Sequence, residues 1–203
     1  MKNKFKITGL YYKVQDYKLR KYLNIRKINS LIKRPDIMVI MMNPGGSKPV
    51  DGIDNNIIES EAIPDRTQDQ IMKVMKTCKF EYARVLNLTD IREPKSQKMF
   101  LKALEMDQKG IPHSLFDSRR RKEFDSLFIK NVPVIFAWGV GKELQLLAVK
   151  AIKAIGIDNL IGLNKEGVDW AYYHPLPQNY QKQVEWVEKI TEALNKSTKQ
   201  ESV

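Results

Sequence analysis

Two polar side chains that could act on a ligand follow apolar runs far apart in the chain. Asn43 begins Asn43-Pro44-Gly45-Gly46 after residues 37–42, and His174 begins His174-Pro175-Leu176-Pro177 after residues 168–173. Each run is typical of a buried strand, and in open parallel α/β sheets ligands bind at the carboxyl ends of the strands. If both strands belong to one sheet, an amide and an imidazole meet at the same edge.

Strand-like and helix-like segments alternate along the rest of the chain. The apolar patterns predict the four strands 37–42, 83–88, 132–139 and 168–173. They predict helices at 66–78, 96–108, 117–129, 141–155 and 179–195. This alternation favours parallel pairing with right-handed crossovers. We therefore expect an α/β protein, a three-layer α/β/α sandwich around a central parallel sheet of about four strands.

Basic residues are concentrated at the start of the chain. Residues 1–34 hold eleven Lys or Arg and one acid, Asp16, a charge of 11 − 1 = +10, while the whole chain carries +11. Residues 9–28 predict a short hairpin or irregular β-element. We expect 1–34 to be a basic extension packed on a domain of residues 35–195, with a polar tail at 196–203. Basic groups interleaved with tyrosines suit nucleic acid, although a solvated basic face would have the same composition.

The composition argues against a membrane-spanning or secreted protein. No apolar run approaches the ~18 residues that cross a bilayer, and the first residues lack the apolar stretch of a secretory signal. The single cysteine, Cys78, fits a helical core pattern. We expect a cytoplasmic monomer that neither binds a membrane nor needs a metal or cofactor. Trp138 is expected in the core, and His113 in a solvated loop.

The order of four strand-end motifs resembles the uracil-DNA glycosylase superfamily. The motifs are Met41-Met42-Asn43-Pro44-Gly45, Val85-Leu86-Asn87, Ile135–Gly139 and His174–Pro177. The first is similar to the mismatch-specific branch and the last to the classical branch. The chain also resembles an uncharacterised bacterial family of this fold, in which an Asp-Pro-Thr-type segment follows, here Pro64-Asp65-Arg66-Thr67. The resemblance covers roughly residues 37–180.

This resemblance implies hydrolysis of the bond between a pyrimidine base and its sugar, a step of DNA repair that needs no metal. Asn43 would position the attacking water, and His174 would donate a hydrogen bond to the base O2 as charge develops there. Asn87 would match O4 and N3–H of uracil and reject cytosine. Gly45 and Gly46 would let the backbone approach the base, and Tyr82 is a candidate to stack on it.

Two departures from the family pattern bear on the substrate. The classical branch has a tyrosine that blocks thymine where this chain has Gly45, so 5-substituted pyrimidines would fit. The classical branch also has a leucine wedge, where this chain reads Gln178-Asn179-Tyr180. Without a wedge, single-stranded DNA is favoured because unstacking costs less there.

The expected partner is uracil-containing DNA, single- or double-stranded, together with a protein inhibitor that mimics DNA. The residues predicted to contact nucleic acid are Lys13, Lys18, Arg20, Lys21, Arg119, Arg120, Pro175, Pro177 and Gln178. Two alternatives stay open. One is a nucleic-acid-binding protein of the same fold with little or no turnover. The other is a hydrolase of free nucleotides or nucleosides.

Overall fold

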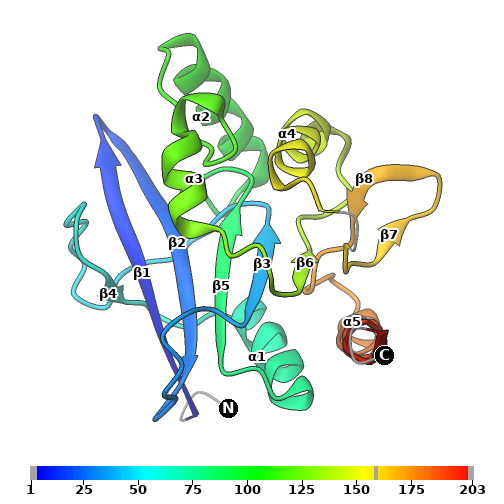
Figure 1. Ribbon diagram of the computed structural model, residues 1–203. Coiled ribbons are helices and arrows are strands. Elements are labelled where there is room, and N and C mark those ends of the chain that lie inside the picture. The colour runs from blue at the N-terminus through cyan, green and yellow to red at the C-terminus, as the bar shows by residue number, and fades with distance from the viewer. Residues whose placement is uncertain (1–3, 158–159, 201–203) are drawn as a thin grey trace.

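The computed structural model describes residues 4–157 and 160–200, which form a mixed sheet with helices on both faces (Figure 1). The six strands of the sheet lie in the order β4-β1-β2-β5-β3-β6. Their bounds are β1 Phe5–Val14, β2 Tyr17–Lys27, β3 Ile37–Met41, β4 Ser60–Glu61, β5 Tyr82–Asn87 and β6 Val134–Phe136. The helices are α1 Arg66–Cys78, α2 Ser96–Gln108, α3 Arg121–Leu127, α4 Gln145–Ile155 and α5 Tyr180–Gln200. Short 3₁₀ turns, Ser118–Arg120 and Lys142–Leu144, precede α3 and α4.

The three strands β5, β3 and β6 form the parallel half of the sheet. Met41 at the end of β3 pairs with Asn87 at the end of β5, and Ile40 pairs with Phe136 of β6. All five residues of β3 are buried, because helices cover both of its faces. A central parallel strand accordingly consists of apolar residues throughout. The carboxyl ends of these strands therefore lie at one edge, as the sequence predicts.

The antiparallel half is built by the basic N-terminal segment. β1 pairs with β2, and β2 pairs antiparallel with β5 through Leu23 and Val85. Within β1, Phe5 and Ile7 face the core while Lys6 is exposed. This alternation places the charges of a strand on one face and its apolar residues on the other. The hairpin expected at 9–28 is thus longer, and it continues the same sheet.

Two layers of helices cover the sheet. On one face α1 and α5 pack against β3 and β5 around Met72 and Trp186. On the other face α3 and α4 pack around Phe124 and Ala148. α2 packs its Met99 and Met106 against Leu19 of β2. The structure is therefore an α/β protein with a partly parallel, six-stranded sheet and five α-helices in the described residues.

The prediction of a fourth parallel strand at residues 168–173 is wrong. Residues 168–172 form β8 (Val168–Tyr172), which pairs antiparallel with β7 (Asn164–Lys165) in a separate ribbon. Ile161 bridges Ile135 and so occupies part of the edge of β6. Gly139 bonds to Tyr172, which keeps the ribbon beside the end of the sheet. The sheet is consequently mixed, with three parallel strands rather than four.

The helix and strand predictions in the middle of the chain are close to the structure. α1 and α2 have the predicted bounds, and the predicted helices at 117–129 and 141–155 each begin as a 3₁₀ turn. α5 runs on into the predicted polar tail as far as Gln200, and residues 201–203 lie outside the described residues.

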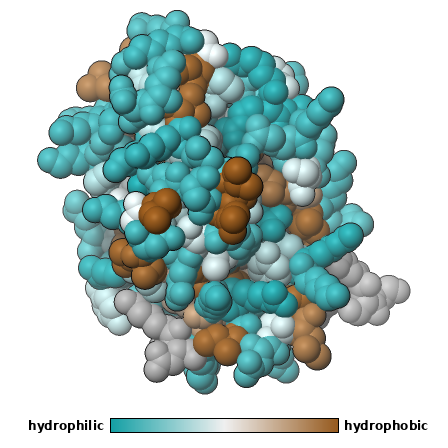
Figure 2. All heavy atoms as spheres, turned by 90° about the vertical axis from the view of Figure 1, so that its left-hand side faces the viewer, coloured by the Kyte–Doolittle hydropathy of each residue, from teal (hydrophilic) through white to brown (hydrophobic). Residues whose placement is uncertain are grey.

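The surface on the β4 side is mainly hydrophilic, with separate hydrophobic spots (Figure 2). Val50, Ile53, Ile57 and Ile58 are exposed in the long loop before β4. Within residues 4–157 and 160–200, we find no helix with the length and apolar composition that would span a membrane.

Candidate functional site

A cavity of about 450 Å³ lies at the carboxyl ends of β3 and β5, on the face of the sheet that α1 covers. Both Asn43 and His174 line it, as the sequence analysis predicts. Its volume lies within the range of small-molecule sites. The lining residues are Arg20, Leu23, Met41, Met42, Asn43, Pro44, Gly45, Gly46, Asp65, Arg66, Thr67, Gln68, Ile71, Val85, Pro94, His174 and Leu176.

The side chain of Asn43 is held by its nitrogen. Nδ2 donates to the carbonyl oxygens of Ile91 at 3.1 Å and Glu93 at 2.8 Å. Two carbonyl partners fix which end of the amide is nitrogen, since only the NH₂ group can donate. Within the described residues Oδ1 has no hydrogen-bond partner, so it is free to accept from a water or a ligand in the cavity.

His174 follows β8 and is held in one protonation state. The backbone N–H of Leu176 donates to its Nδ1 at 3.1 Å, which leaves the proton of a neutral imidazole on Nε2. Burial lowers the pKa of His174 below its ordinary value. The ring is therefore neutral near pH 7 and has an Nε2–H donor. Trp186 of α5 anchors this segment by donating to the carbonyl of Tyr173.

The Gly45-Gly46 turn presents backbone donors beside Asn43. Ser47 N–H bonds back to the carbonyl of Pro44, and Gly45 adopts a φ of 58°, which favours glycine. In the part of the chain that the structure describes, the N–H groups of Gly45 and Gly46 have no hydrogen-bond partner. A Cβ at Gly45 would meet no atom within 4 Å, so the turn borders open space.

The N-terminus of α1 forms the rim of the cavity. Asp65 caps the helix by accepting from Gln68 N–H at 2.9 Å, and Gln68 Oε1 accepts from Asp65 N–H at 3.1 Å. This capping box explains why the helix begins at Arg66. Both Arg66 and Thr67 line the cavity, so the positive end of the helix dipole lies at its edge.

Arg20 is the buried cation of the cavity. It comes from β2, is only 3% exposed, and its Nε has no hydrogen-bond partner among the described residues. Burial lowers its pKa, and the nearby Tyr11 and Asp65 oppose that shift. Arg20 was predicted on a nucleic-acid surface, whereas the structure places it in the wall of the cavity that Asn43 and His174 line.

Asn87 lies at the end of β5 beneath this cavity. It is fully buried, and neither its Oδ1 nor its Nδ2 has a partner within residues 4–157 and 160–200. Alternation along β5 puts it on the same face as Val85, which lines the cavity. Its side chain does not line the cavity itself. An unpartnered buried amide costs about 1–3 kcal/mol.

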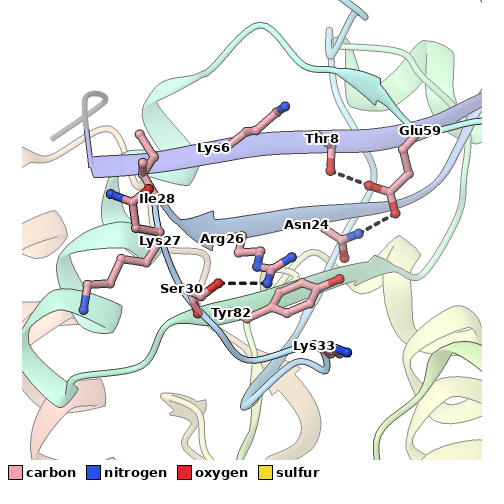
Figure 3. Close-up of a pocket in the computed structure, with 11 residues that line it drawn as sticks. Lys6, Thr8, Asn24, Arg26, Lys27, Ile28, Ser30, Lys33, Glu59 and Tyr82 are labelled. Carbon is pink, nitrogen blue, oxygen red and sulfur yellow. Dashed lines mark hydrogen bonds between the residues drawn. The ribbon is translucent and has the colours of Figure 1, made fainter.

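The structure does not bring Tyr82 to this site. Tyr82 begins β5 at the opposite end of the strand from Asn87 and faces the other side of the sheet. There it lines a groove of about 540 Å³ with Lys6, Asn24 and Arg26 (Figure 3). The predicted stacking role next to Asn43 is therefore wrong. Among the described residues lining the Asn43 cavity there is no Phe, Tyr or Trp, and its apolar wall is aliphatic.

Arg120 is also misassigned by the sequence analysis. It is 6% exposed and donates to Asp90 at 2.7 Å and to Glu123 at 3.1 Å. Asp90 has no exposed surface, and Tyr12 O–H also donates to it. This network joins β1, the segment after β5 and the start of α3, and the guanidinium is already bound by two carboxylates, so it is not available to a phosphate backbone.

The other predicted nucleic-acid contacts are dispersed. Lys13 and Lys18 pair near the tip of the β1–β2 hairpin and are exposed, and neither lines the cavity. Lys21 forms a salt bridge with Glu123. Arg119 is exposed but its side chain is bound by Asp117 and by the carbonyl of Gly110.

A smaller cavity of about 340 Å³ adjoins the first and shares His174 with it. Pro177 lines this second cavity, together with Lys182 and Lys189 of α5. Pro175 is buried, and its carbonyl accepts from Gln70 of α1 at 3.4 Å. Gln178 is exposed. His174 therefore stands between two hollows, one of which is bordered by lysines.

The predicted position of Trp138 is confirmed, and that of His113 is wrong. Trp138 is fully buried against Phe136 and Tyr172, which confirms its core position. His113 is 3% exposed, and its Nδ1 lies 2.8 Å from Thr89 Oγ1, so the expected solvated loop position is wrong. Neither residue lines the cavity of Asn43.

No protein-family model, curated protein or solved structure matched the chain in three separate comparisons. In residues 4–157 and 160–200 no three His, Cys, Asp or Glu side chains form a group that could hold a metal ion.

Proposed function

We propose that the protein is a DNA glycosylase of the uracil-DNA glycosylase type, which hydrolyses the N-glycosidic bond of uracil or a related pyrimidine. The observation that supports this most strongly is that Asn43 and His174 line one cavity at the carboxyl ends of the parallel strands. We also propose the specific fold of that superfamily, because three of its four strand-end motifs end on neighbouring parallel strands.

The orientation of the two side chains suits this chemistry. The free Oδ1 of Asn43 accepts a hydrogen bond from a water molecule and holds that water for attack on the sugar carbon. The Nε2–H of a neutral His174 donates to the pyrimidine O2 as the base leaves with its bonding electrons. One such donor contributes about 10²–10³-fold to the rate.

The same geometry predicts slow turnover. An amide oxygen orients water but is a much poorer base than a carboxylate. Losing ~3 kcal/mol of transition-state stabilisation corresponds to ~10²-fold in rate. The roomy turn at Gly45 has no side chain to reject a 5-methyl group, so we propose tolerance of 5-substituted pyrimidines.

DNA would approach along the rim that the two cavities share. Arg66 lies at the mouth of the larger cavity, and the smaller one is bordered by Lys182 and Lys189 together with one acid, Glu185. The basic groove around Lys6 and Arg26 lies on the other face of the sheet, so one strand could not lie straight across both.

The test is excision from defined oligonucleotides. The full chain, in excess, is incubated with single- and double-stranded DNA carrying one uracil, and abasic sites are cleaved with alkali. We expect product from the single strand first, because its bases are already unstacked. If the protein binds both oligonucleotides but releases no product after long incubation, the non-catalytic alternative is favoured.

A further inference from the structure

We propose that the Asn43–His174 cavity contains an anion subsite, in which Arg20, the Gly45-Gly46 turn and the N-terminus of α1 hold a phosphate group of the ligand. The ligand would then be a nucleotide rather than a neutral base or nucleoside. This inference builds on the proposed function because it names the charged part of the ligand at the same site.

The first observation is the state of Arg20. Its guanidinium lies in the cavity wall at 3% exposure with an unpartnered Nε, and no salt bridge within the described residues neutralises it. The other arginines that are mostly buried differ in this respect. Arg120 is paired with Asp90, and Arg92 is paired with Asp54. Tyr11 and Asp65 lie near enough to favour its charged form, but neither forms a salt bridge with it. A buried charge is normally paired or bound to a ligand, so Arg20 lacks the paired carboxylate that Arg120 and Arg92 have.

The second observation is the set of backbone donors next to it. The N–H groups of Gly45 and Gly46 are unpaired within the described chain, and both residues line the cavity. The first turn of α1 adds the amides of Arg66 and Thr67, because the capping box already pairs the amide of Gln68. Backbone amides at a glycine turn and a helix N-terminus are a recurrent cradle for phosphate.

The charge balance of the lining favours an anion. Arg20 and Arg66 are its two cations and Asp65 is its only acid within the described residues. The Asp65 carboxylate is already engaged, since it accepts from both the backbone and the side chain of Gln68. Its remaining negative charge opposes an anion at the rim, and the guanidinium of Arg20 deeper in the wall is left to attract one.

The arrangement favours phosphate over a planar carboxylate. The donors come from β2, from the 44–47 turn and from α1, three segments that border the cavity from different sides. A phosphate has acceptor oxygens pointing in several directions and can contact all three. A carboxylate has two oxygens in one plane and suits the single fork of one arginine.

The experiment is calorimetric titration of the full chain with inorganic pyrophosphate, deoxyuridine, deoxyuridine 5′-monophosphate and its 5′-methyl diester. We expect the monophosphate to bind about 10- to 100-fold more tightly than deoxyuridine. In Arg20→Met this ratio should fall to about one. Lys6→Met, which removes a cation from the opposite face of the sheet, should leave the ratio unchanged.

Several outcomes would overturn the subsite. Equal affinity for deoxyuridine and its monophosphate in the wild-type protein would do so, as would an unchanged ratio in a folded Arg20→Met. If that variant does not fold, Arg66→Met at the exposed rim provides the second test, with an expected smaller fall in the ratio.

The remaining comparisons separate this inference from the proposed function and identify the source of the phosphate. Pyrophosphate binding that depends on Arg20 would support the subsite even if no uracil is ever excised. Binding of the methyl diester as tight as that of the monophosphate would indicate a DNA phosphate. A preference for the monophosphate would indicate a free nucleotide.

Discussion

The backbone N–H of Leu176 donates a hydrogen bond to Nδ1 of His174 at 3.1 Å. This bond is possible only while Nδ1 carries no proton, so it defines the tautomer of the ring. The residue pair belongs to a segment tied to α1 and α5 through the carbonyls of Pro175 and Pro177. A short turn thus sets both the position and the protonation of the side chain to which we assign the leaving base.

The two histidines, His113 buried and His174 half-buried, make stability depend on pH. Burial lowers the pKa of both His174 and His113, so the unfolded chain binds more protons between their folded pKa values and about 6.5. The stability that the neutral histidines support is therefore fully present above about pH 6.5, and it is lost as the pH falls through their folded pKa values. Urea unfolding at pH 7.5 and 5.5 should show lower stability at the acid pH.

The control for this prediction is His174→Gln, which cannot titrate. Its stability should fall less between the two pH values than that of the wild-type protein. An identical fall in both proteins would mean that His174 does not titrate in this range. The remaining slope in the variant includes the contribution of His113.

Replacing Asn87 should not destabilise the protein. Both polar atoms of this buried amide lack partners in the described chain, so Asn87→Leu removes an unsatisfied group of about 1–3 kcal/mol. We expect an unfolding free energy equal to or above that of the wild type in urea titration.

Asn24 is the matched control for Asn87. It is 3% exposed, donates to Glu59 at 2.8 Å and accepts from Arg84 at 3.0 Å. Asn24→Leu should therefore destabilise the protein by about 1–3 kcal/mol. If Asn87→Leu were as damaging as Asn24→Leu, the Asn87 amide would have a structural partner.

Arg120 should prove structural rather than nucleic-acid-binding. Arg120→Met leaves the buried Asp90 carboxylate without its cation, which costs about 3–5 kcal/mol in such pairs. Arg119→Met, at the exposed neighbour, should change stability by less than about 0.5 kcal/mol. Thermal unfolding of the two variants decides this, and equal melting temperatures would contradict the buried pair.

Replacing Asn43 by Asp should not create a better catalyst. The two carbonyls of Ile91 and Glu93 that now accept from Nδ2 would face a carboxylate oxygen instead. We expect a loss of about 2 kcal/mol in stability and a carboxyl pKa raised by this environment. The free energies of unfolding of Asn43→Asp, Asn43→Ala and the wild-type protein, measured by urea titration, test this loss of stability. A more stable aspartate variant would show that the amide orientation is not enforced by those carbonyls.

The sequence allowed the site to be predicted better than the sheet. Asn43 is identifiable because an apolar run ends in Asn-Pro-Gly, and that pattern requires a buried strand and then a turn. β8 could not be distinguished from a sheet strand, because its run of apolar residues does not reveal that Ile161 occupies part of the edge of β6. Position along the chain also could not show that Tyr82 and Asn43 face opposite sides of the sheet.

The basic residues of the N-terminal segment were predicted to lie in an extension on the surface of the domain. Most of them belong instead to two strands of the central sheet. The alternation of Phe5, Lys6 and Ile7 is that of a half-buried strand, and it explains how basic residues belong to the sheet itself. The burial of Arg20 depends on the irregular pairing of β1 with β2 near Gly9 and Tyr11. A one-residue register shift of this kind changes which face a side chain occupies.

The excision proposal requires Asn43 and His174 to act on one substrate. The most direct measurement is the single-turnover rate of uracil release from a single-stranded oligonucleotide by wild-type protein, Asn43→Ala, His174→Gln and Asn164→Ala. Asn164 is a matched control, since its Nδ2 also donates to two carbonyls, those of Val168 and Ala171, but outside the cavity. We predict release by the wild type and by Asn164→Ala, and a loss of about 10²-fold or more in the other two. Release that is equal in all four proteins would contradict the account.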